Sequence, residues 1–367
     1  VSGHMAVIKP DPQIYAILEE DCALDPESLL FADDRPENIE AAAARGWQTH
    51  LFEHPQGWAD LDKDQADALG PFAEGEALLD WLGLCDALAA GHDLPKAQIG
   101  DTFLYRDPDT LLSRAAWIDG MGSLVKTATI FPGNPGNGQP MVNGGVSLYS
   151  DQDGTLDALV DFHLVTKWKT AGDSLLAARR LARPDATQIL IVGAGTVGGS
   201  LIEAFGAGFP DATITLWNRT ASSAETLAAS YPGTMVATDL ETAVGAADII
   251  VTATMSSEPV IKGDWLRPGQ HLNLIGAYRP DMRETDDTAL TRSKIFVDSR
   301  DTTLDHIGEL KIPLGTGAIQ RGDVVADYYD LASFQPGDDE TITLFKNGGG
   351  AHLDLMTARY ILDRWKA

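Results

Sequence analysis

Residues 189–201 read Ile-Leu-Ile-Val-Gly-Ala-Gly-Thr-Val-Gly-Gly-Ser-Leu. The four apolar residues 189–192 predict a buried strand, and three glycines follow it in the Gly-x-Gly-x-x-Gly spacing. The first glycine permits a tight turn, the second lets a pyrophosphate approach the backbone, and the third lets the next helix pack on the strand. An amphipathic helix and a second strand, 212–217, follow. The pattern predicts a Rossmann domain whose cofactor contacts include Gly193, Gly195, Thr196, Val197 and Gly198.

The end of the second strand bears on which dinucleotide binds. An NAD site usually carries Asp or Glu about 20 residues past the motif, bonded to the ribose 2′-hydroxyl. Here that place holds Asn218, Arg219 and Thr220. A guanidinium and a hydroxyl suit a 2′-phosphate, and no carboxylate repels it. We therefore expect NADP(H) to be preferred over NAD(H). The alternative is that Arg219 is a solvated loop residue.

Composition limits the class of protein. A chain of 367 residues is expected to form about two or three domains. The net charge of −27 argues against nucleic-acid and anionic-membrane partners, and no run of 18 apolar residues predicts a membrane span. Cys22 and Cys85 are far apart, which predicts neither a disulfide framework nor a metal site, and favours a cytoplasmic location.

The predicted fold class is α/β, with three parts. Residues 1–65 read as a partial α/β fragment. Residues 71–165 and 320–367 form the predicted β-rich substrate and dimerisation domain, because 100–160 show short alternating strands separated by glycine turns. Residues 166–319 form the predicted Rossmann domain, in which strands and helices alternate as a parallel sheet requires.

Residues from about 95 to 360 resemble the ornithine cyclodeaminase and mu-crystallin family. The resemblance implies a Rossmann domain beside a β-rich domain, a homodimer, and NAD(P) chemistry on a small amino or imino acid. It also places Thr252, Ala253, Thr254 and Gly276 near the nicotinamide. The stretches that carry it are the strand around Lys126, Pro132-Gly133-Asn134, Gly138-Gln139-Pro140, Thr166-Lys167-Trp168-Lys169-Thr170-Ala171, the dinucleotide motif, Thr252-Ala253-Thr254, Asn273-Leu274-Ile275-Gly276-Ala277 and Arg283-Glu284.

The first 55 residues resemble the haloacid dehalogenase hydrolases. In that family the lysine neutralises a phosphoryl group, and the acidic pair helps to hold Mg²⁺. The nucleophilic aspartate of that family belongs upstream, in an Asp-x-Asp motif that this sequence does not contain there. We expect a truncated, inactive remnant or a gene-level fusion. The stretches concerned are Ser2-Gly3, Lys9-Pro10-Asp11-Pro12 and Phe31-Ala32-Asp33-Asp34-Arg35-Pro36-Glu37-Asn38.

Three basic residues are candidates for chemistry. Lys126 lies in an apolar strand, and a desolvated lysine can act as an acid. The family places its substrate-facing, catalytic lysine here; the alternative is an edge-strand lysine that points outward. Lys169 stands where the family usually has an arginine that grips the substrate carboxylate, and it keeps the charge but loses the bidentate fork. Arg114 is the candidate for a second carboxylate clamp, with an exposed arginine as the alternative.

The loop at residues 276–280 bears on the reaction. Cyclodeaminases carry an aspartate after the Gly-Gly of this loop, whereas this sequence reads Gly-Ala-Tyr-Arg-Pro, which places Tyr278 at the predicted substrate site. His163, His306 and His352 are isolated, so we expect no metal. The sequence therefore predicts an NADP(H)-dependent reductase of a small carboxylate-bearing imine, of the ketimine and pyrroline-2-carboxylate class. The alternatives are an ornithine cyclodeaminase and a mu-crystallin-like protein that binds NADPH and a small ligand. A phosphatase is disfavoured.

Overall fold

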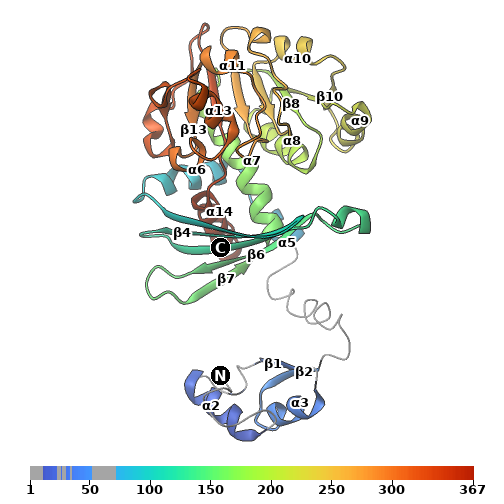
Figure 1. The fold of residues 1–367 in the computed structure, drawn as a ribbon, viewed down its shortest axis with the longest axis vertical. Helices are drawn as coiled ribbons and strands as arrows, with labels where there is room; N and C mark the ends of the chain where they lie inside the picture. Colours follow the sequence, from blue (N-terminus) through green and yellow to red (C-terminus); the bar gives the residue numbers. More distant parts are fainter. Residues whose placement is uncertain (1–10, 23–25, 27–29, 34, 52–71) are drawn as a thin grey trace. The chain divides into compact units, whose positions relative to one another are not determined.

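The structure is a computed structural model that describes residues 11–22, 26, 30–33, 35–51 and 72–367. The chain divides into two compact units, Val1–Pro71 and Phe72–Ala367, which are described separately. Figure 1 shows the elements of each unit.

The first unit contains a strand–helix–strand arrangement. Strands β1 and β2 pair in parallel, as expected when a helix connects two strands of one sheet. Ile14, Tyr15, Ala42 and Trp47 form its small buried core. Of the residues that resemble a hydrolase, 2, 3, 9, 10 and 34 lie outside the described residues, so that resemblance stays a prediction. The elements are α2 (Pro12–Cys22), β1 (Leu30–Asp33), α3 (Pro36–Ala43) and β2 (Gln48–Leu51).

The second unit begins with two helices and a five-stranded antiparallel sheet, in which each strand pairs with the next along the chain. On β5 the side chains alternate, and Leu124, Lys126 and Ala128 are buried on the inner face. Helix α14 packs against β4 and β5. The elements are α5 (Phe72–Ala77), α6 (Trp81–His92), β3 (Gln98–Arg106), β4 (Asp109–Ile118), β5 (Gly122–Ile130), η2 (Asn134–Asn137), β6 (Val142–Tyr149) and β7 (Leu156–Val160).

An eight-stranded parallel sheet follows, in the order β10-β9-β8-β11-β12-β15-β13-β14. Helices cover both faces, because alternate residues of β8 enter two different clusters: Ile189 and Ile191 in one, Leu190 and Val192 in the other. The elements are α7 (Phe162–Leu181), β8 (Gln188–Val192), α8 (Thr196–Gly208), β9 (Thr213–Trp217), α9 (Ala221–Ala229), β10 (Met235–Val236), α10 (Leu240–Ala246), β11 (Ile249–Thr252), η3 (Gly263–Trp265), β12 (His271–Leu274), α11 (Asp287–Thr291), β13 (Ser293–Val297), α12 (Arg300–Thr303), α13 (Gly308–Thr316), η4 (Arg321–Asp323), β14 (Val324–Ala326), η5 (Tyr328–Ser333), β15 (Ile342–Lys346) and α14 (Ala351–Lys366).

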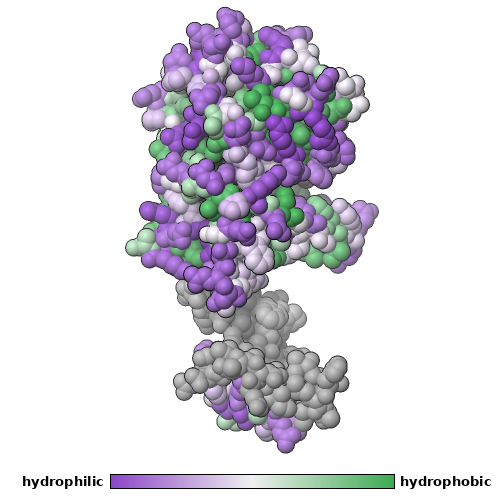
Figure 2. All heavy atoms as spheres, turned by 90° about the vertical axis from the view of Figure 1, so that its left-hand side faces the viewer, coloured by the Kyte–Doolittle hydropathy of each residue, from purple (hydrophilic) through white to green (hydrophobic). Residues whose placement is uncertain are grey.

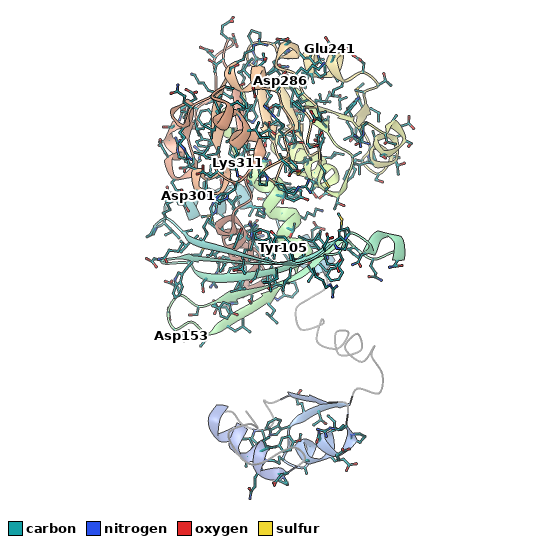
Figure 3. The ribbon with its side chains drawn as sticks, in the orientation of Figure 1. Tyr105, Asp153, Glu241, Asp286, Asp301 and Lys311 are labelled. Carbon is teal, nitrogen blue, oxygen red and sulfur yellow. The ribbon has the colours of Figure 1, made fainter. Side chains whose placement is uncertain are left out.

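Two helices join the sheets, as Figure 1 shows. Helix α7 contacts β6 of the antiparallel sheet and β12 of the parallel sheet, and α14 returns from β15 to the antiparallel sheet. At the same junction the carboxylate of Asp301 on α12, labelled in Figure 3, pairs with Lys96 Nζ at 2.7 Å. One continuous core therefore includes residues of both sheets.

The predicted domain boundary at residue 320 differs from the structure. Strands β14 and β15 lie in the parallel sheet, and β15 is inserted between β12 and β13. The prediction placed 320–367 in the substrate domain, whereas within that range it is α14 that packs on the antiparallel sheet. A short, mainly apolar stretch such as Ile342-Thr343-Leu344-Phe345 indicates a buried strand without indicating which sheet it joins.

Two surface observations complete the fold. On the face shown in Figure 2, hydrophilic residues cover most of the surface, and hydrophobic residues form small separate patches. Among the described residues, no helix is long and apolar enough to cross a membrane.

Candidate active site

The glycine-rich turn has the geometry that the motif requires. Gly193 has a φ of +126°, and a Cβ there would lie 2.6 Å from the carbonyl oxygen of Ala253. A Cβ on Gly198 would lie 2.3 Å from the oxygen of Gly193, so the helix can approach only without a side chain. Gly195 is the N-cap of α8 and has open space where a Cβ would stand. The helix N-terminus with its free N–H groups is thus accessible to an anion, with Thr196 and Val197 in its first turn.

An open hollow of about 570 Å³ lies between this turn and α9. Its lining includes Gly195 and Thr196 on one side and Ser222 and Ser223 of α9 on the other. Arg219 is exposed just before α9 and forms no ion pair among the described residues. Backbone N–H groups and hydroxyls therefore face a space large enough for part of a nucleotide.

Asn218 ties the turn to the end of β9. Its Oδ1 accepts a hydrogen bond from the Ala194 N–H at 3.2 Å, and its Nδ2 donates to the Thr220 carbonyl at 3.0 Å. The side chain that replaces the usual acidic residue thus positions the backbone of the glycine turn and leaves no carboxylate beside Arg219.

The loops that follow β11 and β12 meet next to this turn. Thr252 ends β11 and is buried, and the Ala253 carbonyl touches Gly193. A Cβ on Gly276 would lie 1.8 Å from the Thr254 oxygen, so only glycine lets the two loops approach so closely. Ligands of open parallel sheets bind outside the carboxyl ends of the strands, where the strand order reverses, and here that place lies between β8 and β11.

A row of charged side chains crosses the inner face of the antiparallel sheet. The strand register places Asp101 opposite Arg114, and Arg114 opposite Lys126. Lys126 is only 6% exposed on the central strand, which excludes an outward-pointing edge lysine. Its Nζ donates to Asp354 Oδ1 at 2.8 Å and to Thr166 Oγ1 at 2.9 Å.

Arg114 and Lys169 converge on the same place. The Arg114 Nη2 donates to Asp101 at 2.6 Å, and its Nη1 donates to the Gly349 carbonyl at 2.8 Å and lies 3.6 Å from Asp354 Oδ2. Lys169 Nζ donates to the same Gly349 carbonyl at 3.4 Å. The structure thus brings together three predicted cations that are far apart in the sequence. The Asp101 carboxylate occupies most of the Arg114 fork, which leaves Arg114 less free than a bidentate clamp would be.

Burial determines the electrostatics of this cluster. Desolvation lowers the pKa of Lys126 to about 8; Asp354 opposes that shift, and the nearby charges of Lys169 and Arg114 add to it. Burial alone would raise the pKa of Asp354, but the charges of the three cations hold it below its usual value. Lys126 can therefore exchange a proton near neutral pH, which suits an acid–base group.

Asp354 was not predicted as a site residue, although a helix was predicted at 351–365. This carboxylate is fully buried in the first turn of α14, and its Oδ2 has no hydrogen-bond partner among the described residues. The available signal was the position of Asp354 in Ala351–Met356, where every other residue except His352 is apolar. A charge in such a stretch is expected to be buried and so to need a partner.

Tyr278 and the histidines form no hydrogen bond or ion pair with this cluster in residues 72–367, although His352 lies close enough to feel the charges of Asp354, Lys169 and Arg114. Tyr278 is 55% exposed, and the Arg279 guanidinium lies 5.8 Å from its ring centroid. Within residues 72–367 no hydrogen bond or ring contact joins Tyr278 to Lys126. His352 is buried 5.3 Å from the His92 ring, whereas His163 is exposed. The described residues contain no group of three or more His, Cys, Asp or Glu that could hold a metal ion.

Comparison with known proteins places the chain in a family. Residues 119–367 match the ornithine cyclodeaminase/mu-crystallin family. The chain is 47% identical over 309 residues to the Delta(1)-pyrroline-2-carboxylate reductase of Paracoccus denitrificans, an alignment that covers 82% of this chain and 97% of that protein. It is 34% identical over 245 residues to the ketimine reductase mu-crystallin of Rattus norvegicus, covering 66% and 76%.

Solved structures share the fold. The Thermococcus litoralis Delta(1)-pyrroline-2-carboxylate reductase in complex with NADH and L-proline has a TM-score of 0.73 and 24% identity, covering 80% of this chain and 95% of that chain. An archaeal alanine dehydrogenase dimer with bound NAD has a TM-score of 0.73 and 27% identity, covering 80% and 93%. The predicted α/β fold and the predicted family resemblance are therefore confirmed, and the chain belongs to the ornithine cyclodeaminase/mu-crystallin family.

Proposed function

We propose that this protein is an NADP(H)-dependent reductase of a small cyclic imine that carries one carboxylate, of the pyrroline-2-carboxylate class. The observation that carries the proposal is the buried cluster of Lys126, Arg114, Lys169 and Asp354 at the loop after β15, which leaves the same edge of the parallel sheet as the dinucleotide turn. The relatives named as pyrroline-2-carboxylate and ketimine reductases support the same oxidoreductase chemistry.

The cations of the cluster can hold a substrate carboxylate. Three cations (Arg114, Lys126 and Lys169) lie with the carboxylates of Asp101 and Asp354, and the buried carboxyls of Asp298 and Asp173 also act on Lys169. Arg114 is largely engaged by Asp101, which makes Lys169 the main group to hold the substrate carboxylate, with the Nη1 side of Arg114 beside it.

Lys126 is the proposed proton donor. When bound, the reduced nicotinamide supplies the hydride that reaches the imine carbon. Lys126 Nζ, protonated below its pKa of about 8, gives a proton to the imine nitrogen, so that C=N becomes CH–NH. Thr166 and Asp354 hold the ammonium in one orientation, and the buried setting excludes water that would weaken these charge interactions.

We infer that NADP(H) is preferred over NAD(H). Arg219, Thr220 and the serines 222 and 223 of α9 can surround a 2′-phosphate, with no carboxylate to oppose it. Arg219→Ala should raise the Kd for NADPH at least tenfold, because it removes a charge-assisted hydrogen bond worth roughly 1.5–3 kcal/mol, and it should leave the Kd for NADH nearly unchanged. The exposed Arg180→Ala is the matched control. An unchanged ratio of the two Kd values would remove Arg219 from this role.

The reaction is tested by following NADPH absorbance with 1-pyrroline-2-carboxylate as substrate. We expect NADPH consumption and formation of proline. Formation of proline and ammonia from ornithine, faster than imine reduction, would support the cyclodeaminase instead. Binding of NADPH with no turnover of any cyclic ketimine would support a binding protein of the mu-crystallin type.

We further propose a homodimer in the cytoplasm. The outer sheet face, defined by Leu104, Trp117 and Leu159, exposes these side chains at 60%, 54% and 50%, which favours a partner surface. The archaeal alanine dehydrogenase with the same fold is a dimer, which supports a second copy as that partner. Cys85 is a free, buried thiol, in keeping with a reducing compartment. Light scattering of the pure protein would give twice the mass of one chain.

A further inference from the structure

Glu284 is a fully buried acidic residue that the reaction above does not use. It lies in the segment between β12 and α11, two residues before Asp286, which Figure 3 labels. Its Oε1 accepts hydrogen bonds from the N–H and the hydroxyl of Thr254, both at 2.7 Å. Its Oε2 accepts from the Gly276 N–H at 2.7 Å. One carboxylate thus joins the loop after β11 to the loop after β12.

The backbone of Glu284 is itself held in place. Its N–H donates to Glu309 Oε2 at 2.5 Å, and its carbonyl accepts from the N–H groups of Val260 and Ile261 at 2.8 and 2.9 Å. Glu309 on α13 is also fully buried. The backbone of Glu284 is therefore held both by Glu309 and by the 260–261 segment. Its carboxylate has little freedom to follow the loops if they move.

Lys346 fixes the end of β12 from the neighbouring strand β15. This lysine is fully buried at the end of β15, and its Nζ donates to the carbonyls of Leu274 at 3.0 Å and Ile275 at 3.4 Å. Desolvation lowers the pKa of Lys346, and the charges of Glu284 and Glu309 oppose this effect. Burying two acids and a base costs desolvation free energy, and neutral groups could hold the two loops together equally well. Stability alone therefore does not explain why these charged groups lie beneath the loops.

The position of the two loops that Glu284 joins indicates which part of a bound dinucleotide they contact. The glycine turn after β8 touches Ala253, and Ala253 immediately precedes Thr254. A dinucleotide whose pyrophosphate lies on the glycine turn must extend across the ends of β11 and β12, on the side away from α9. The hollow beside α9 would then take the adenosine half.

We propose that Glu284 is a positioning residue for the nicotinamide half of the cofactor, because it sets the spacing of the loops at 252–254 and 275–276. The proposal rests on the proposed function only in that the cofactor is a nicotinamide dinucleotide. It separates two parts of one binding site: Arg219 acts on the adenosine half, and Glu284 acts on the nicotinamide half.

The test compares two ligands by titration calorimetry. NADPH carries the nicotinamide, and 2′-phospho-ADP-ribose lacks it. Glu284→Gln keeps the size of the side chain, but its amide NH₂ must face a backbone N–H that needs an acceptor. We expect the Kd for NADPH to rise at least tenfold and the Kd for 2′-phospho-ADP-ribose to change by less than threefold. Equal weakening of both ligands, or weakening of neither, would overturn the proposal.

Asp248→Asn is the matched control. Asp248 also accepts bonds from two backbone N–H groups, those of Thr187 at 2.9 Å and Gln188 at 3.0 Å, at the opposite edge of the same sheet. Its loss should leave the ratio of the two Kd values unchanged. Arg219→Ala provides the reverse pattern, because it should weaken both ligands together.

A second pair of variants covers the case in which Glu284→Gln does not fold. Thr254→Val removes one of the three bonds to Glu284, and Thr254→Ser retains it. The valine variant should raise the Kd for NADPH more than the serine variant does, and neither should change the Kd for 2′-phospho-ADP-ribose; an equal effect of the two variants on NADPH would contradict the proposal. A wild-type protein that binds neither ligand would refute both proposals. One that binds NADPH without reducing imines would refute only the proposed function.

Discussion

Replacement of Asp354 by asparagine tests the reasoning about Lys126 most directly. Asp354 Oδ1 lies 2.8 Å from Lys126 Nζ, and both groups are buried. Asparagine keeps the shape of the side chain and an oxygen acceptor, but it removes the negative charge that favours the ammonium form of Lys126. The neighbouring charges of Arg114 and Lys169 remain and continue to disfavour that form.

The size of the effect follows from this contact. A hydrogen bond to a charged group contributes roughly 1.5–3 kcal/mol. Because one pKa unit corresponds to about 1.36 kcal/mol, the pKa of Lys126 should fall from about 8 by roughly one to two. A proton donor must be protonated, so activity is lost as the pH rises through this pKa. The alkaline limb of the pH profile should therefore move to lower pH by the same amount.

The assay is kcat/KM for imine reduction as a function of pH, which reports the groups of the free enzyme. Asp101→Asn is the control, because Asp101 bonds to Arg114 and not to Lys126, so its limb should stay in place. Lys126→Ala should lower kcat by roughly 10²-fold or more and remove the limb. An Asp354→Asn limb that stays in place, or moves to higher pH, would refute the assignment of Lys126 as the acid.

Two further predictions concern stability and assembly. Burial lowers the pKa of His271 from 6.5 in the unfolded chain to about 3 in the folded protein. Its contribution to the free energy of unfolding is therefore present above about pH 6.5 and is lost as the pH falls towards 3. The loss should reach up to roughly 5 kcal/mol. In His271→Leu the melting temperature should depend less on pH in that window than in the wild type or in the exposed-site control His163→Leu; parallel curves for all three would contradict this explanation. Trp117→Lys on the outer sheet face should shift the light-scattering mass from two chains towards one without loss of NADPH binding, and a mass that stays at two chains would exclude this face as the interface.

Local sequence was sufficient wherever a short stretch carries its own physical requirement. Gly193 needs a positive φ, Gly198 needs the space of a side chain, and Gly195 leaves open space at the start of α8; the spacing of these glycines predicted each role. The family resemblance was confirmed by the comparisons. A nicotinamide cofactor follows at the family level, whereas the preference for NADP(H) stays a prediction.

The tertiary structure decided how the candidate site is assembled. Lys126 and Asp354 are 228 residues apart, and only the return of α14 onto β4 and β5 brings them to 2.8 Å. The pairing of Asp101 with Arg114, which reduces the freedom of that arginine, depends on a strand register that no periodicity specifies. The sequence likewise did not predict that β15 lies between β12 and β13, and so it did not predict where Lys346 lies. Backbone conformation and burial are determined within a few residues, but the partner of a buried charge is determined by chain segments that meet only after folding.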